Sequence, residues 1–199
     1  MEKIIKYFRS NMGYARMKDL KKASFQTRDI SALLKEGIIE RVKPGLYRFV
    51  DFKCKDVANL SMLDVCQAVP KGVICLVTAL SYYNLSTFNP SEIYIAIPHA
   101  TKPLEINYPP IKFFFFRERF YKPGIDKIET KMGEIKIYNK EKTVCDMFRY
   151  RNKLGTDIAL EGLKSYLKLK EANINKLSKY AEICQVKTVM MPYVRAIVG

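Results

Sequence analysis

The sequence has a single histidine, His99, and no pair of cysteines at the C-x-x-C spacing. One histidine excludes an HExxH zinc site and leaves only one candidate base for nucleophilic catalysis. An odd number of cysteines without such a pair argues against both a disulfide framework and a zinc cluster. We therefore expect buried, reduced thiols at all five cysteine positions, which are Cys54, Cys66, Cys75, Cys145 and Cys184.

Long apolar runs are also absent. No segment approaches the roughly 18 apolar residues that a membrane span needs, and Lys3, Lys6 and Arg9 interrupt the apolar positions at the start of the chain. Hydrophobic residues make up 48% and charged residues 28% of the sequence, which is typical of a globular protein. We expect a soluble, unexported protein that resides in the cytoplasm.

Acidic residues are scarce relative to basic ones in this chain of 199 residues. Lys and Arg number 35 against 20 Asp and Glu, which gives a net charge of +15. Such a surplus favours a partner rich in phosphate, either nucleic acid or an anionic membrane. Residues 1–53 hold 13 Lys and Arg against 6 Asp and Glu, so this first part contributes almost half of the surplus.

Residues 1–53 have the pattern of three helices and a hairpin. Apolar residues at steps of three and four, namely Ile4, Ile5, Phe8 and Met12, predict the first helix. Ser24 is expected to cap the third helix through its side-chain oxygen. The remaining predicted elements are helices over 16–23 and 25–36 and strands over 38–42 and 46–50.

The predicted hairpin turns at Lys43-Pro44-Gly45, where Pro presets φ and Gly supplies a positive φ. Three helices followed by a basic hairpin are the plan of a winged helix-turn-helix, whose third helix enters the major groove of DNA. Arg28 is the best candidate for reading a base, since arginine donates two hydrogen bonds to guanine. The predicted DNA-binding residues are Gln26, Thr27, Arg28 and Ser31 for base edges, Lys35, Lys43 and Arg48 mainly for phosphates, and Arg41 on the same hairpin.

A second interpretation of this region is a small helical subdomain with solvated charges, in which Arg28 pairs with Asp29 or Glu36.

After the predicted hairpin, residues 51–56 are a polar joint, and a predicted helix that ends before Pro70 follows them. A strand over 72–77, a helix over 78–85 and strands over 92–97, 111–116, 125–129 and 134–138 then precede four helices. We predict an α+β fold with a DNA-binding domain over 1–53 and a larger mixed domain over 54–199.

Three features of the larger domain suggest further chemistry. Phe113 to Phe116 could form a stacking platform for single-stranded nucleic acid, although a strand buried on both faces is the more common outcome. Asp126 with Glu134 and Lys136 has the pattern of a magnesium-dependent nuclease, but Glu-x-Lys is frequent in a lysine-rich chain. A second basic surface is a possible arrangement of Arg149, Arg151, Lys153, Lys164 and Lys168; a solvated face is the alternative. His99 is expected to be an ordinary loop or core residue.

Several segments are distinctive: Gly13-Tyr14-Ala15, then LLKEGIIERV at 33–42 with PGLYR at 44–48, and EKTVCDMF at 141–148. With these segments the chain resembles, over nearly its whole length, the AbiEi-type antitoxins of type IV toxin–antitoxin abortive-infection systems. The resemblance implies that the amino-terminal winged helix binds inverted repeats in its own promoter and represses the operon. It also implies that the carboxy-terminal domain counteracts a nucleotidyltransferase toxin without a stable complex.

Together, these arguments predict a protein without catalytic residues, metal or cofactor. Two copies are expected per operator, because inverted half-sites match two molecules. The alternatives are a stand-alone winged-helix transcriptional regulator, a nonspecific nucleic-acid-binding protein and a magnesium-dependent nuclease.

Overall fold

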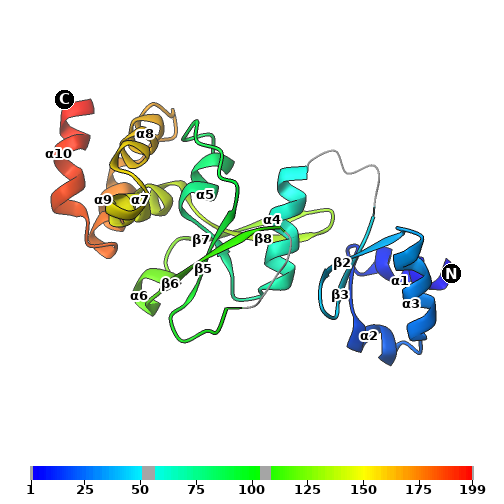
Figure 1. The fold of residues 1–199 in the computed structure, drawn as a ribbon. Helices are drawn as coiled ribbons and strands as arrows, with labels where there is room; N and C mark the ends of the chain where they lie inside the picture. The colour runs from blue at the N-terminus through cyan, green and yellow to red at the C-terminus, as the bar shows by residue number, and fades with distance from the viewer. Residues whose placement is uncertain (1, 51–56, 104–108, 199) are drawn as a thin grey trace. The chain divides into compact units, whose positions relative to one another are not determined.

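The computed structural model describes residues 2–50, 57–103 and 109–198 and confirms the predicted α+β fold (Figure 1). The polar joint predicted at 51–56, with Cys54, lies outside the described residues. Contacts divide the chain into two compact units. Unit 1 comprises Met1–Pro70, Leu104–Pro110 and Glu129–Ile135, and unit 2 comprises the remaining residues.

Unit 1 begins with the predicted order of helices and hairpin. Its elements are α1 (Glu2–Ser10), β1 (Tyr14–Arg16), α2 (Met17–Lys22), α3 (Thr27–Lys35), β2 (Ile39–Lys43), β3 (Leu46–Phe49) and α4 (Val57–Ala68). The three strands form one antiparallel sheet in the order β1-β3-β2. One apolar core joins this sheet to α1, α2 and α3, because Ile4, Leu20, Ile30, Leu33 and Tyr47 are all buried together.

The turn between β2 and β3 confirms the role predicted for glycine. Gly45 has φ +77°, and its carbonyl oxygen accepts a hydrogen bond of 2.9 Å from the backbone N–H of Met17. β1 was not expected from the sequence. It forms because Tyr14, Ala15 and Arg16 pair with Arg48, Tyr47 and Leu46 of β3, and pairing between residues so far apart in the chain leaves no local periodicity.

Two expectations for unit 1 are wrong. Met12 does not extend the buried stripe of α1: the helix ends at Ser10, and Met12 has φ +54° and is 57% exposed. Ser24 does not cap α3, because it lies at φ +63° in the turn after α2, two residues before Gln26. Gln26 is the N-cap residue of α3, and its side chain makes no capping hydrogen bond.

Unit 2 contains most of a five-stranded mixed sheet, in the order β6-β5-β4-β8-β7, and the carboxy-terminal helices. Its elements are β4 (Val73–Ile74), α5 (Leu76–Tyr82), β5 (Ile93–Pro98), β6 (Ile111–Phe116), α6 (Glu118–Tyr121), β7 (Ile125–Thr130), β8 (Gly133–Tyr138), α7 (Lys140–Leu154), α8 (Thr156–Leu167), α9 (Ile174–Ile183) and α10 (Lys187–Val198). The ends of β7 and β8 that meet at their turn fall in unit 1. The four closing helices confirm the prediction, whereas β4 is shorter than expected and α6 is new.

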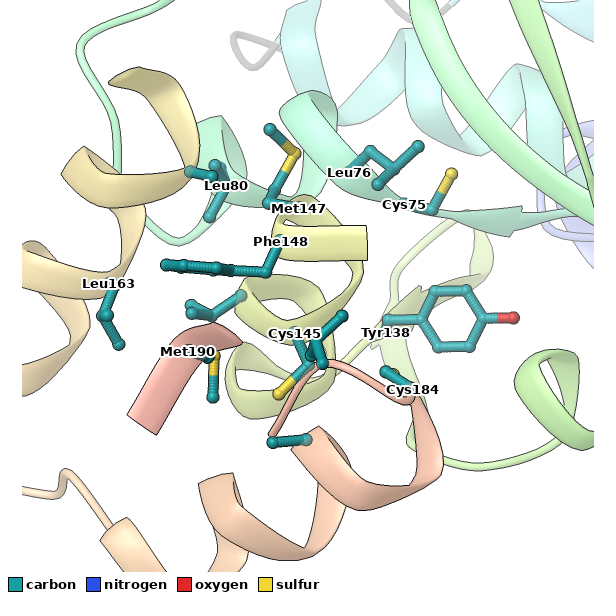
Figure 2. Packing of buried hydrophobic residues seen from close by; sticks show 14 of the residues in the cluster. Cys75, Leu76, Leu80, Tyr138, Cys145, Met147, Phe148, Leu163, Cys184 and Met190 are labelled. Atoms are coloured by element: carbon teal, nitrogen blue, oxygen red, sulfur yellow. The ribbon is translucent and has the colours of Figure 1, made fainter. Parts of the chain in front are cut away.

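The largest apolar core lies in unit 2, where α5, α7, α8 and α10 supply side chains that point toward one another (Figure 2). Phe148 and Leu163 are among its fully buried members. The four cysteines within the described residues, Cys66, Cys75, Cys145 and Cys184, are buried, as predicted. Burial raises the pKa of the Cys75 and Cys145 thiols well above the ordinary value.

The aromatic run in β6 alternates instead of being buried on both faces. Phe114 and Phe116 are buried, while Phe115 is 41% exposed. β6 is one of the two edge strands of the sheet and pairs in parallel with β5, so its outer flank has no covering strand among the described residues. His99 follows β5 as an exposed loop residue, in agreement with the loop expectation, and its backbone N–H donates to the carbonyl oxygen of Phe116.

Candidate nucleic-acid interface

One face of α3 presents polar and basic side chains to solvent. We call it the recognition face; it consists of Thr27, Arg28, Ser31 and Lys35, all of which are exposed, and Gln26 is exposed as the N-cap residue before it. The opposite face buries Ile30 and Leu33 in the core of unit 1. Because the helix is anchored on its apolar side, all five residues that the sequence predicted for this helix are exposed. Four of them share the recognition face, and Gln26 lies at the start of the helix, outside that face.

Arg28 has the freedom that base reading requires. Its side chain is 79% exposed, and its Nε lies 3.8 Å from a carboxylate oxygen of Asp29. An exposed pair at this distance contributes little and is screened by salt. Arg28, Ser31 and Lys35 recur at steps of three and four residues, so they lie along one stripe of the helix.

The three basic residues predicted on the hairpin have different surroundings. Arg41 is exposed on β2, with its guanidinium 5.9 Å from the centre of the Tyr47 ring. Lys43 and Arg48 are only partly exposed, and both contact α4. The structure therefore does not place all of the predicted phosphate-binding residues on one open surface.

Arg48 belongs to a buried polar cluster around Asp64 of α4. The Asp64 carboxylate accepts a hydrogen bond of 2.6 Å from the Tyr14 hydroxyl, and the same oxygen lies 3.0 Å from Arg48 Nε. Arg48 also donates to Glu40 at 2.6 Å, and its side chain is 12% exposed. Burial raises the pKa of the Asp64 carboxyl above its ordinary value, although the Tyr14 hydrogen bond and the Arg48 charge act in the opposite direction.

Lys43 contacts the carboxyl end of α4. Its ammonium donates a hydrogen bond of 2.7 Å to the carbonyl oxygen of Ala68, and Arg16 donates at 3.3 Å to the carbonyl oxygen of Gln67. The last carbonyls of a helix have no partner within the helix and favour cations. Loss of solvent and the nearby Arg16 charge lower the pKa of Lys43.

Sequence reasoning missed the basic side chains of α2. Lys18, Lys21 and Lys22 are exposed, whereas Leu20 between them is buried. In a helix-turn-helix, the helix before the recognition helix crosses the DNA backbone. The signal was present in the sequence, since these lysines flank the apolar position that fixes the second helix.

The second basic surface forms only in part. Arg149 packs with its guanidinium 3.7 Å from the centre of the Phe120 ring and is 21% exposed. Arg151 is half-buried and donates to the carbonyl oxygen of Phe148 at 2.7 Å. Lys153 on α7 and Lys164 and Lys168 at α8 are exposed. The Lys153 ammonium also lies 5.5 Å from the centre of the Phe114 ring, so three of the five predicted residues make contacts inside unit 2.

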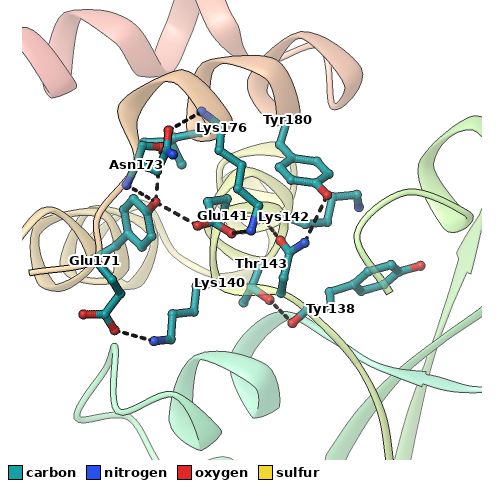
Figure 3. Close-up of polar contacts among 12 residues, drawn as sticks. Tyr138, Lys140, Glu141, Lys142, Thr143, Glu171, Asn173, Lys176 and Tyr180 are labelled. Atoms are coloured by element: carbon teal, nitrogen blue, oxygen red, sulfur yellow. Dashed lines mark hydrogen bonds and ion pairs between the residues drawn. The ribbon is translucent and has the colours of Figure 1, made fainter. Parts of the chain in front are cut away.

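The segment 141–148, which is one of the three segments behind the family resemblance, is entirely buried in the first part of α7. Glu141 accepts a hydrogen bond of 3.0 Å from the Tyr166 hydroxyl of α8 and lies 2.9 Å from the Lys176 ammonium of α9 (Figure 3). Asn139 caps α7 by accepting from the backbone N–H of Lys142 and donates to the Tyr180 hydroxyl. These contacts tie three helices together.

Lys142 and Asp146, one turn apart in α7, form an ion pair in which both side chains are 0% exposed. The Lys142 ammonium lies 4.3 Å from the centre of the Tyr138 ring, and the Cys184 thiol donates to Asp146 at 3.4 Å. Burial raises the pKa of Asp146, while the Lys142 charge opposes that shift. With no exposed atoms, this pair has a structural role.

The suspected nuclease residues lie on the last two strands of the chain. Asp126 is exposed on β7, and Glu134 and Lys136 lie on β8. Within residues 2–50, 57–103 and 109–198, no group of three or more His, Cys, Asp and Glu side chains could hold a metal ion.

In the same ranges, no helix is long and apolar enough to cross a membrane.

Comparison with known families identifies the region that contains the recognition face. Residues 2–50 match the family described as "Transcriptional regulator, AbiEi antitoxin". No curated protein matches the chain. The family match spans α1 through β3 and confirms the resemblance to AbiEi-type antitoxins for this part of the sequence. Unit 2 lies outside it.

Proposed function

We propose that the protein is a DNA-binding transcriptional repressor and the antitoxin of a type IV toxin–antitoxin system. The observation behind the proposal is the recognition face of α3, which lies within the residues that match the AbiEi antitoxin regulators. Its polar side chains and the helix order of unit 1 suit a winged helix-turn-helix that inserts α3 into the major groove. Residues 1–53 are the proposed DNA-binding domain.

In this proposal Arg28 reads a base, and Gln26, Thr27 and Ser31 contact neighbouring base edges. Lys35 and Arg41 are exposed and contact phosphates. The operator is an inverted repeat in the protein's own promoter, and two copies bind it because each half-site receives one recognition helix.

The test compares two duplexes by fluorescence anisotropy of the full-length protein: the DNA upstream of its own coding sequence and a scrambled version. We expect a preference for the upstream duplex of about a thousandfold or more, as specific binders show. Arg28→Ala should lose about 1 to 3 kcal/mol on the upstream duplex and little on the scrambled one. Arg195→Ala removes an exposed cation of α10 and is the matched control.

Equal losses of Arg28→Ala on both duplexes would show that Arg28 contacts phosphate and does not read a base. Equal affinity of the wild-type protein for both duplexes would refute the operator and leave a nonspecific nucleic-acid-binding protein.

The antitoxin half of the proposal has a separate test. Co-expression should rescue growth of cells that produce a nucleotidyltransferase toxin from the neighbouring gene, and Arg28→Ala should still rescue when both genes are under an unrelated promoter. Operator binding without rescue would instead identify a stand-alone transcriptional regulator.

A further inference from the structure

The hairpin of unit 1 directs two of its cations toward the protein itself. Lys43 donates to the carbonyl oxygen of Ala68, and Arg48 pairs with Asp64. Together with Arg16 and Tyr14, they join all three strands of the amino-terminal sheet to α4. Lys43 and Arg16 donate to backbone carbonyl oxygens at the end of α4, and Tyr14 and Arg48 contact the buried Asp64 carboxylate. Each contact therefore gives a polar group of α4 a partner.

DNA phosphate would have to compete with these partners. Asp64 is only 6% exposed, and it would lose its closest positive charge if Arg48 turned toward a phosphate. Removing one partner of a buried pair is strongly unfavourable, because the remaining charge is left unpaired and out of water. If Lys43 turned away, the end of α4 would lose its hydrogen-bond donor to Ala68.

The exposed lysines of α2 do not have to leave a buried partner in order to reach a phosphate. Lys18, Lys21 and Lys22 all lie at the surface, and the turn at Ala23 and Ser24 leads from them directly to the recognition face. Flexible, hydrated ammonium groups are suited to phosphate binding as point charges. Their position on the helix before α3 is the one from which a helix-turn-helix contacts the DNA backbone.

We infer that α2 adds phosphate contacts to those of Lys35 and Arg41 through Lys18, Lys21 and Lys22, whereas Lys43 and Arg48 are positioning residues that attach the hairpin to α4. Only the phosphate contacts of α2 rest on the proposed DNA binding. The attachment of the hairpin makes α4 an integral part of the DNA-binding unit, and Asp64 is the anion that holds the hairpin through Arg48.

The experiment measures the affinity of the full-length protein for a scrambled duplex over a range of salt concentrations. Each lost phosphate contact should reduce the slope of log K against log salt by about 0.9. We expect that reduction for Lys21→Ala and Lys22→Ala, with unchanged melting temperatures. Lys43→Met should keep the wild-type slope but lower the melting temperature, and Lys43→Arg, which retains a donor, should restore it. Lys3→Ala on α1 is the matched exposed control.

A flatter slope for Lys43→Met with unchanged α2 variants would overturn the inference and support the hairpin as the phosphate-binding element. An unchanged melting temperature for both Lys43→Met and Asp64→Asn would refute the attachment to α4. Absence of binding to any duplex at low salt would refute the proposed function and the α2 contacts, while the melting temperatures would still decide the role of Lys43. Loss of preference for the upstream duplex alone would refute the operator and leave these slopes measurable.

Discussion

Neutralising one member of the buried Lys142–Asp146 pair should destabilise unit 2 severely. Both side chains are 0% exposed, so Asp146→Asn leaves the Lys142 ammonium without its nearest anion in a site closed to water. The ring of Tyr138, 4.3 Å from that ammonium, is too weak a partner to replace a carboxylate. Breaking such a pair costs about 3 to 5 kcal/mol.

Replacing both members by apolar residues should cost much less. Lys142→Met with Asp146→Leu removes both charges at once, and apolar replacement of a buried pair is often neutral or stabilising. We therefore expect a coupling energy of at least about 2 kcal/mol in the double-mutant cycle. Urea unfolding followed by far-ultraviolet circular dichroism gives the four free energies of unfolding.

The exposed pair of Lys140 and Glu171 is the matched control for this cycle. It also joins α7 to the segment before α9, but its side chains are 30% and 60% exposed, so its removal should change stability little. A loss below about 1 kcal/mol for Asp146→Asn, or a double variant that loses the sum of the single losses, would refute the ionised buried pair.

Two further predictions concern a helix contact and a glycine. Hydrogen bonds from the backbone N–H of Thr87 and from Ser86 lower the pKa of Glu161, so its stabilising effect exists above the ordinary value of 4.5 and disappears as pH falls through the lowered pKa. Glu161→Gln should therefore be less stable than wild type at pH 7 in thermal unfolding, and the difference should shrink below pH 4.5; a constant difference would contradict this. Gly124→Ala should unfold at a much lower temperature, since φ is +81° and the new Cβ would lie 2.8 Å from Lys142 Cβ. Gly45→Ala, at φ +77° in open space, should lose only about 1 kcal/mol, and equal losses would contradict the steric reasoning.

Elements with a sustained apolar period were predictable from the sequence. The four closing helices and β6 were expected in the right places, and Ile30 and Leu33 correctly identified the buried side of α3. Very short elements were not predictable. β1 depends on its pairing with β3, and the four residues of α6 are too few to show a helical period.

The candidate site could be predicted only as far as local spacing determines exposure. Helical geometry placed Arg28, Ser31 and Lys35 on one stripe because that relation depends on the helix alone. The surroundings of Arg48 depend on Asp64, which is far away in the sequence and showed no signal as its partner. The same holds for Arg149, whose aromatic neighbour Phe120 lies on α6.

Net charge predicts a phosphate-rich partner only through the cations that remain exposed. Lys142 and Arg48 add to the charge of +15, yet both face carboxylates inside the protein. The lysines of α2 do face solvent, and so do Arg28 and Lys35 on the adjacent helix. Since counterion release depends on the cations that reach phosphate, the salt dependence of DNA binding should follow the exposed charges of α2, α3 and Arg41 and not the charge of the whole amino-terminal region.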